Sequence, residues 1–174
     1  MSMLTANDII KQFDLAPLPG EGGFYRETFR DPHTIDVIFP GETDIVTRSA
    51  STAIYFMVTP ERFSALHRVK QFEVFHFYQG DPVDLLMIDE NGGVEIRTLG
   101  PNIEQGHHLQ IVVPPRVWQG LRLKAEGNQF NWSLMGTTVA PGFEFADFEL
   151  ADKTSLIEQF PQIRDLILKY LPED

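Results

Sequence analysis

The sequence predicts an all-β fold, an antiparallel barrel or sandwich. From Gly23 to about Glu149 the chain consists of short β-like runs separated by turn residues, about eleven in all. No helical period separates these runs, which excludes alternating strand–helix–strand units and favours antiparallel pairing. The clearest hairpin joins residues 83–88 to 94–99, because Asn91-Gly92 between them can take the positive φ angles of a tight type I′ turn.

A short helix is expected before the strands, over residues 5–14. Thr5 can cap it, with Asp8 at the reciprocal position of a capping box, and Ile9 and Phe13 belong to an apolar stripe at helical spacing. The prolines and glycine of residues 17–20 end the helix.

The β-barrel is expected over residues 23–150. Its predicted strands are residues 23–29, 34–39, 51–58, 64–69, 73–78, 83–88, 94–99, 108–113, 118–124, 130–135 and 143–150. The run 51–58 is almost continuously apolar, which is typical of a strand covered on both faces. Apolar surface in excess of one barrel interior predicts cover by the terminal helices or by a second copy, and we expect a homodimer.

Residues 154–171 return to a helical pattern, with apolar residues recurring at three- and four-residue spacing. Pro161 divides this stretch, and it fits the first position of a second helix, where no intrahelical N–H bond is lost. Two short helices are therefore expected on the outside of the barrel. The whole chain, residues 1–174, is expected to form one domain.

Composition excludes several functions. The chain has 14 Lys and Arg against 25 Asp and Glu, for a net charge of −11, which argues against nucleic-acid or anionic-lipid partners. Cysteine is absent, so disulfides, thiol catalysis and thiolate metal sites are excluded. No apolar run is long enough to span a membrane, and the polar, acidic start does not resemble a signal peptide. A cytoplasmic location is expected.

Residues 67–80 carry the most informative polar pattern. Side chains two apart on a strand share a face, so His67 points the same way as Val69, and Glu73 the same way as Phe75 and Phe77. If the two strands are neighbours, His67 and Glu73 converge inside the barrel above a floor of the two phenylalanines. An imidazole beside a carboxylate in an apolar cavity suits an acid–base pair or part of a metal site.

This stretch resembles the first motif of the cupin superfamily, His-x-His, three or four residues, Glu, six residues, Gly. Here the pattern is His67, Val69, Glu73 and Gly80, with one ligand replaced. The second motif, Pro-x-Gly, two residues, His, is matched by Pro114, Arg116 and Gln119. The segments EGGFYRETFR, STAIYF and PPRVWQ resemble a small cupin branch of unassigned function.

The resemblance implies a jelly-roll barrel with a small-molecule pocket, and three functions stay open. The first is isomerase or epimerase chemistry on a sugar-like or small polar carbonyl substrate, with His67 as base, Glu73 polarising it and a tyrosine as proton donor. The second is a cupin that binds a small molecule without transforming it. The third is a metal-dependent enzyme with a weakly held divalent metal on His67, Glu73 and Gln119, since Val69 cannot be a ligand.

Other residues are expected to contact the ligand. Arg26 would hold an anionic or hydroxyl-rich molecule, and its alternative is a surface ion pair with Glu27. Tyr55 would offer a hydroxyl, and its alternative is a place in the core. Leu121 follows Gln119 on the same strand face, so both would line the pocket with Phe75 and Phe77.

Overall fold

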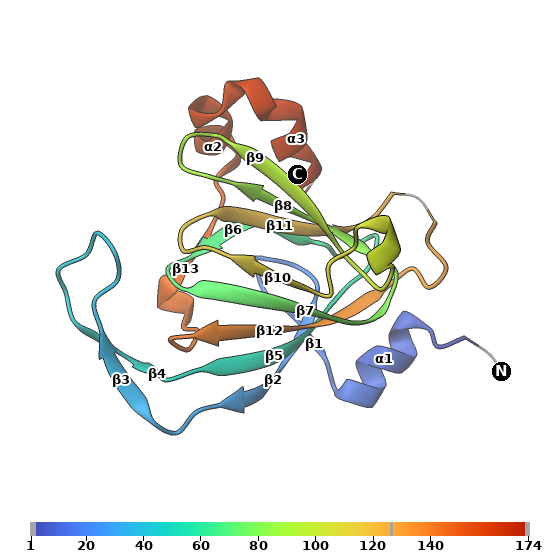
Figure 1. Cartoon of the computed structure of the whole chain (residues 1–174), viewed down its shortest axis with the longest axis horizontal. Helices are drawn as coiled ribbons and strands as arrows, with labels where there is room; N and C mark the ends of the chain where they lie inside the picture. Colours follow the sequence, from blue (N-terminus) through green and yellow to red (C-terminus); the bar gives the residue numbers. More distant parts are fainter. Residues whose placement is uncertain (1–2, 126, 173–174) are drawn as a thin grey trace.

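Two antiparallel sheets face each other in a computed structural model of the chain, which describes residues 3–125 and 127–172 (Figure 1). The six-stranded sheet has the order β1-β2-β5-β12-β7-β10 and the five-stranded sheet the order β13-β6-β11-β8-β9. This arrangement confirms the predicted all-β, antiparallel jelly roll.

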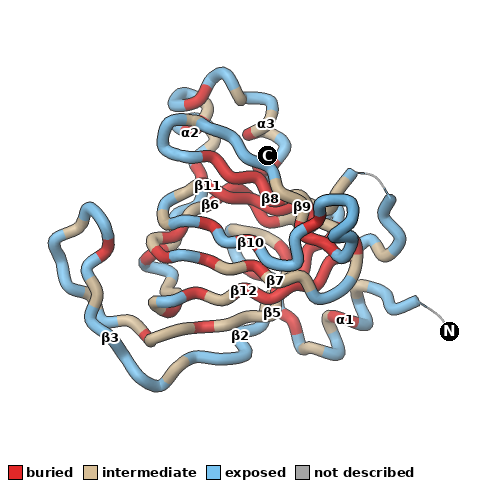
Figure 2. Tube along the Cα trace, in the orientation of Figure 1, coloured by how far each residue is buried: buried red, intermediate tan, exposed pale blue. Residues whose placement is uncertain are grey.

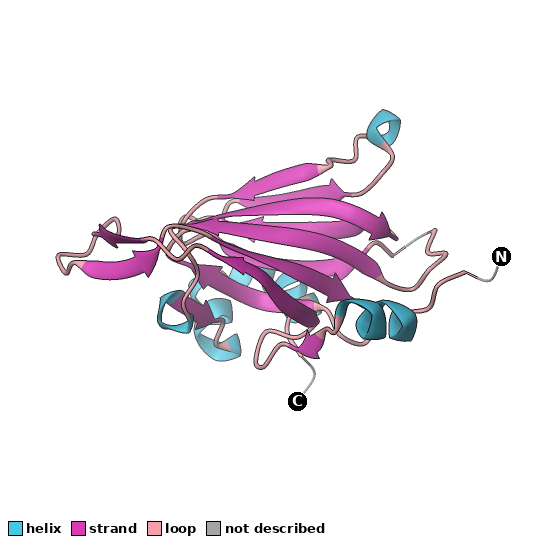
Figure 3. Ribbon diagram, turned by 90° about the horizontal axis from the view of Figure 1, so that it is seen from below, coloured by secondary structure: helices cyan, strands magenta, loops and turns pink. Residues whose placement is uncertain are grey.

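The strands of the six-stranded sheet are β1 (Ala16–Pro17), β2 (Phe24–Arg30), β5 (Thr52–Val58), β7 (Phe72–Gly80), β10 (Gln110–Val113) and β12 (Ser133–Ala140). Those of the five-stranded sheet are β6 (Ser64–Val69), β8 (Val83–Ile88), β9 (Val94–Leu99), β11 (Trp118–Leu123) and β13 (Phe148–Leu150). A separate hairpin of β3 (Thr34–Val37) and β4 (Val46–Ser49) projects from one end of the body (Figures 1 and 3). The helical elements are α1 (Ala6–Phe13), η1 (Ile103–Gln105), η2 (Phe145–Asp147), α2 (Lys153–Gln159), η3 (Pro161–Ile163) and α3 (Arg164–Lys169).

The core lies between the sheets, and the tube in Figure 2 shows buried residues concentrated in the central strands. Inward-facing side chains of both sheets build it because successive residues of a strand point to opposite faces. Its buried members include Phe56, Phe75, Leu85, Leu121 and Met135. They fill one end of the jelly roll, and the other end is left for the polar residues described below.

The terminal helices cover the outer faces of the sheets, as the sequence predicts. Thr5 caps α1 and exchanges hydrogen bonds with Asp8, and Ile9 packs with Met57 and Trp132 on the six-stranded sheet. On the five-stranded sheet, α2, η3 and α3 cover a second apolar cluster that includes Leu66, Leu86, Leu156, Phe160 and Ile167. Pro161 begins η3, the position predicted for it.

Two strand predictions are wrong for local reasons. β12 starts at Ser133 and not at Phe130, because the buried Asp81 carboxylate accepts backbone N–H bonds from residues 129–131 and holds them in a turn. Of residues 143–150, only β13 is a strand, because Asp147 is anchored to Arg48 and Gln71 and keeps the preceding residues in a loop.

His67 and Glu73 lie on opposite sheets, not on neighbouring strands of one sheet. β6 ends at Val69 in the five-stranded sheet, and β7 begins at Phe72 in the six-stranded sheet. The chain therefore crosses the interior in a tight turn. The two side chains face each other across the gap between the sheets.

Over residues 3–125 and 127–172, no helix has the length and apolar character that a membrane crossing requires.

Candidate functional site

A cavity of about 300 Å³ lies between the two sheets, at the end that the apolar core leaves open. Its volume is at the lower end of the range of ligand pockets in proteins. Most of its surface is apolar, and the polar part is dominated by carboxylates. The lining residues are Leu18, Pro19, Glu21, Tyr25, Glu27, Arg30, Thr52, Ile54, His67, Val69, Glu73, Thr137, Val139, Phe143, Glu144, Phe145 and Phe148.

The imidazole of His67 forms part of the cavity wall and is 3% exposed. Its Nδ1 lies 2.8 Å from the carbonyl oxygen of Ala65, which can only accept, so Nδ1 carries the proton. The ring stacks on Phe148, with centroids 5.2 Å apart. Nε2 has no hydrogen bond within the described residues. It is also not among their fully buried polar atoms that lack a partner, so it is accessible from the cavity. His67 therefore presents a fixed, unprotonated nitrogen.

Glu73 and Gln119 meet on the inner side of the cavity. The Gln119 amide nitrogen donates to Glu73 Oε2, and Gln119 is paired in register with His67 through β11 and β6. The structure thus brings His67, Glu73 and Gln119 together. However, no hydrogen bond joins His67 to Glu73 in the described part of the chain, and the Ala65 carbonyl orients the imidazole in place of the predicted carboxylate.

Glu21 is a second carboxylate of the site, largely buried with its side chain 12% exposed, that the sequence did not single out. Its Oε1 accepts a hydrogen bond of 2.6 Å from Ser64 Oγ and lies 3.9 Å from His67 Nδ1. The turn that places it needs glycine, because Gly22 has φ of 100° and a Cβ there would collide with the carbonyl oxygen of Phe63. The signal in the sequence was a carboxylate between the glycines of the segment GEGG.

Burial shifts the protonation of all three groups. It raises the pKa of Glu21 to about 7, against the hydrogen bond from Ser64. Burial also raises the pKa of Glu73 to about 7. The nearby His67 lowers this pKa, and the charge of Glu21 raises it. The pKa of His67 is lowered by burial, although Glu73 and the Ala65 carbonyl favour the charged form. Near neutral pH the imidazole is therefore uncharged and the carboxyls are partly protonated.

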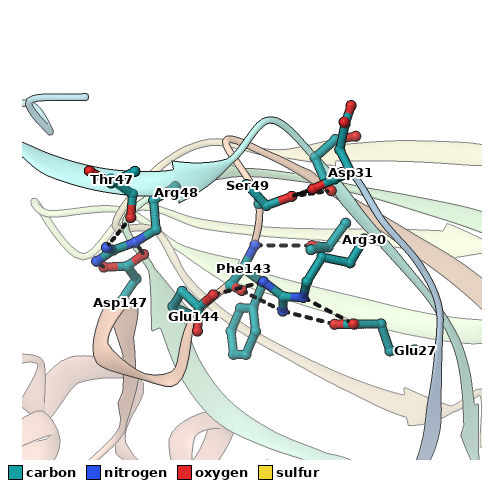
Figure 4. Close-up of polar contacts among 12 residues, drawn as sticks. Glu27, Arg30, Asp31, Thr47, Arg48, Ser49, Phe143, Glu144 and Asp147 are labelled. Atoms are coloured by element: carbon teal, nitrogen blue, oxygen red, sulfur yellow. Dashed lines mark hydrogen bonds and ion pairs between the residues drawn. The ribbon is translucent and has the colours of Figure 1, made fainter. Parts of the chain in front are cut away.

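Arg30 stands at the mouth of the cavity, held by two carboxylates (Figure 4). Its Nε and Nη2 bind the two oxygens of Glu27 at 3.0 and 2.9 Å, and Nη1 binds Glu144 at 2.7 Å. Nη2 also donates to the carbonyl oxygen of Phe143. These hydrogen bonds connect β2 to the loop before β13. They therefore hold the phenylalanines of this loop at the mouth of the cavity.

A second arginine, Arg48, also holds this loop in place (Figure 4). Arg48 on β4 forms two bonds to the Asp147 carboxylate, and Gln71 donates to the same group. Burial opposes ionisation of Asp147, but these hydrogen bonds outweigh it and hold the pKa of Asp147 below its usual range. The loop carries Phe143 and Phe145, and β13 begins with Phe148; the three rings contact one another edge to face.

Two predicted ligand contacts lie outside the cavity. Arg26 forms an ion pair with Asp14, and its side chain is 47% exposed. Tyr55 packs against Phe13 of α1, with ring centroids 5.0 Å apart. Both predictions fail because alternation along β2 turns Tyr25 and Glu27 inward and Arg26 outward, and Arg26 is paired in register with Tyr55.

Three other predicted contacts lie inside the jelly roll but in its core. Phe75 and Leu121 are buried members of the interior cluster, and Phe77 packs against it. None of the three is among the residues that line the cavity, and neither is Gln119, which was predicted to line it with them. The inward direction was predicted correctly, but these positions are further along the strands than the cavity extends.

The residues present do not fit a cupin metal. Within the described residues, no group of three or more His, Asp and Glu side chains could hold a metal ion. Val69 stands at the position of a motif histidine, and the Gln119 amide turns its nitrogen toward Glu73. His67 Nε2 and the Glu73 carboxylate are left as the donors of the motif, fewer than a transition metal needs for tight binding.

The chain belongs to the cupin superfamily: residues 7–151 match the family described as Cupin superfamily (DUF985). A curated relative, the uncharacterized protein YML079W of Saccharomyces cerevisiae, is 31% identical over 132 residues. The match covers 73% of this chain and 66% of the yeast protein, so the chain spans slightly less than two thirds of that relative.

Solved structures show the same fold. A hypothetical protein from Leishmania major is similar over 98% of this chain and 100% of its own, with 34% identity and a TM-score of 0.88. Protein SO0799 of Shewanella oneidensis has 30% identity and a TM-score of 0.84 over 99% and 100% of the two chains. Oxalate decarboxylase of Bacillus subtilis, which has Mn(II) centres, shares only the fold, at 14% identity and a TM-score of 0.52 over 92% of this chain and 41% of its own.

The burial of Glu21 predicts a pH-dependent gain of stability for Glu21→Gln. A carboxyl whose folded pKa exceeds its unfolded value loses stability as pH rises from about 4.5 to about 7. The variant keeps an acceptor for Ser64 and has no such loss, so its free energy of unfolding should exceed that of the parent by up to about 3 kcal/mol above pH 7. Urea unfolding at pH 5 and pH 8 measures the difference.

The exposed Glu90→Gln is the matched control and should show no such difference. A Glu21→Gln variant whose stability relative to the parent is the same at both pH values would contradict the burial of an ionisable carboxyl at this position.

Proposed function

We propose that the protein is a cytoplasmic enzyme that moves a proton on a carbon atom next to the carbonyl group of a small, sugar-like or otherwise polar substrate. The observation that carries this proposal is the fixed, unprotonated Nε2 of His67, which opens on a cavity that also contains two protonatable carboxyls. A base and an acid that face each other across one cavity are what an isomerase or epimerase needs.

His67 is the proposed base. Its Nδ1–H is engaged by the Ala65 carbonyl, so Nε2 keeps its lone pair and cannot exchange roles with the other ring nitrogen. The lowered pKa keeps the imidazole uncharged at neutral pH, ready to accept the substrate proton. The stacked Phe148 ring prevents the imidazole from turning.

Glu73 is the proposed acid. With a pKa of about 7, its protonated form persists at neutral pH and can donate a hydrogen bond to the carbonyl oxygen as negative charge develops there. Tyr25, which lines the cavity, replaces Tyr55 as the tyrosine that could return a proton to carbon. No step in this scheme uses a metal, in line with the donor set of the cavity.

A non-catalytic binding function is the second candidate, and one observation favours it. No carboxylate hydrogen-bonds His67 within the described residues, and a lowered pKa makes the imidazole a weak base. A protein that only binds its ligand needs neither a carboxylate partner for the imidazole nor a raised imidazole pKa.

Solvent deuterium exchange distinguishes the two functions. Small metabolites from a cell extract are incubated with the protein in D₂O, and mass spectrometry identifies the compound that gains one deuterium. His67→Gln should slow this exchange by at least about a hundredfold, the scale of general base catalysis. His76→Gln is the matched control, because His76 lies outside the cavity and bonds to Thr138 and Gln110.

A metabolite that copurifies with the protein and gains no deuterium after long incubation would establish binding in place of catalysis. Exchange that persists undiminished in His67→Gln would remove His67 from the role of base.

We also propose that the protein is a homodimer. The outer face of β7 and β10 carries exposed apolar side chains, with Phe72 53%, Tyr78 51% and Val112 46% exposed. The two terminal helix groups pack elsewhere, α1 on residues that include Met57 and the C-terminal helices on the other sheet. An apolar sheet face of this kind is what a second copy would cover.

Light scattering after size exclusion should give twice the chain mass of 19.8 kDa. Val112→Glu should shift the protein to monomer, because it places a charge in the apolar face. Ile96→Glu is the control, an equally exposed residue on β9 of the other sheet. A monomeric parent protein would contradict the proposal.

A further inference from the structure

We propose that the cavity binds a ligand that carries a protonated amine, and that Glu21 accepts a hydrogen bond from its N–H groups. The inference deepens the proposed function and rests on it for the location of the site. It concerns the charge of the ligand, which neither the family nor the similar structures establish for this chain.

The charged residues that line the cavity are mostly acidic. Four glutamates stand against one arginine and one histidine: Glu21, Glu27, Glu73, Glu144, Arg30 and His67. His67 contributes no positive charge near neutral pH, because burial keeps it neutral. A ligand therefore meets an excess of negative charge, in a chain whose net charge is −11.

Arg30 cannot serve an anionic ligand. Four of its five N–H donors are bound to Glu27, Glu144 and the Phe143 carbonyl, which leaves one donor free. Two carboxylates therefore face the single positive charge of the guanidinium. A carboxylate or phosphate would have to displace these partners while it approached Glu21 and Glu73. Phosphorylated sugars, sugar nucleotides and dicarboxylates are therefore disfavoured.

The buried end of the cavity offers acceptors and few donors. Among the described residues, Glu73 is bonded through Oε2 alone and Glu21 through Oε1 alone, so each keeps a free oxygen. Buried acceptors without donors are unfavourable, and an ammonium group supplies up to three N–H donors together with the missing positive charge.

The apolar lining suits the rest of such a ligand. Tyr25 and the rings of Phe143, Phe145 and Phe148 line the cavity with Ile54. Aromatic faces attract cations, and they also pack against a carbon skeleton. A cavity of about 300 Å³ limits that skeleton to about the size of one six-membered ring.

Three probes of equal shape test the charge preference: cyclohexylamine, cyclohexanol and cyclohexanecarboxylate. Binding to the intact protein is measured by calorimetry near neutral pH, in an amine-free buffer that contains a chelator. The amine should bind at least about tenfold more tightly than the alcohol, because a charge-assisted hydrogen bond is about twice as strong as a neutral one. The carboxylate should not bind.

Variants locate the preference. Glu21→Gln should reduce the ratio of amine to alcohol affinity by at least about fivefold, since it removes a charge and keeps an acceptor. Glu104→Gln, an exposed residue of η1 outside the cavity, should leave the ratio unchanged. A ratio that is equal in the two variants would overturn the assignment to Glu21.

Preferred binding of the carboxylate, equal binding of amine and alcohol, or no binding of the amine at millimolar concentration would each overturn the inference. So would displacement of the amine by Mn²⁺ in the same buffer without the chelator, which would make the acceptors a metal site. Failure of the proposed function would give a different result: His67→Gln would leave deuterium exchange unchanged, whatever the binding of the probes shows.

Discussion

The hydrogen bond from His67 Nδ1 to the Ala65 carbonyl is the interaction on which the site depends. It fixes the tautomer of an imidazole that is otherwise surrounded by ionisable carboxyls, and it leaves Nε2 as the nitrogen that faces the cavity. The bond is local to β6, so it forms wherever that strand forms. The crossing of the chain between β6 and β7 then brings Glu73 to the opposite wall. Two consecutive strands on opposite sheets and the turn between them thus bring His67 and Glu73 to the cavity.

Burial of three titratable groups in one place is costly unless each is satisfied. The protein meets this requirement in part: Ser64 donates to Glu21 and Gln119 donates to Glu73, and the rest is met by protonation near neutral pH. The arginines are used elsewhere, Arg30 at the mouth and Arg48 behind the aromatic loop. The two arginines therefore hold the loop at the mouth of the cavity and do not neutralise Glu21 and Glu73.

Much of this arrangement could be predicted from the sequence. Alternation and turn residues predicted the strands and their inward faces, and the cupin motif brought His67, Glu73 and Gln119 together. Arg116 shows why the motif tolerates substitution: it has φ of 63°, the left-handed conformation that the motif glycine supplies. The crossing between sheets and the partner of Nδ1 could not be predicted, because alternation along a strand does not tell which sheet the strand joins or which backbone atom a side chain meets. Glu21 had a signal in the glycines around it, but its contact with Ser64 joins segments distant in sequence. The prediction for Arg26 failed because alternation along β2 turns this side chain outward; the register of β2 then shifts between Glu27 and Phe29, and Arg30 lines the cavity.

The most direct test of this account is the protonation state of one imidazole. Nitrogen-15 NMR of histidine-labelled protein, followed over a pH titration and assigned with a His67→Gln sample, reports the tautomer and the pKa of each ring. The account predicts that His67 carries its proton on Nδ1 and stays neutral to a pH below the usual histidine value of about 6.5. A His67 ring protonated on Nε2, or one that becomes cationic at or above that pH, would contradict it.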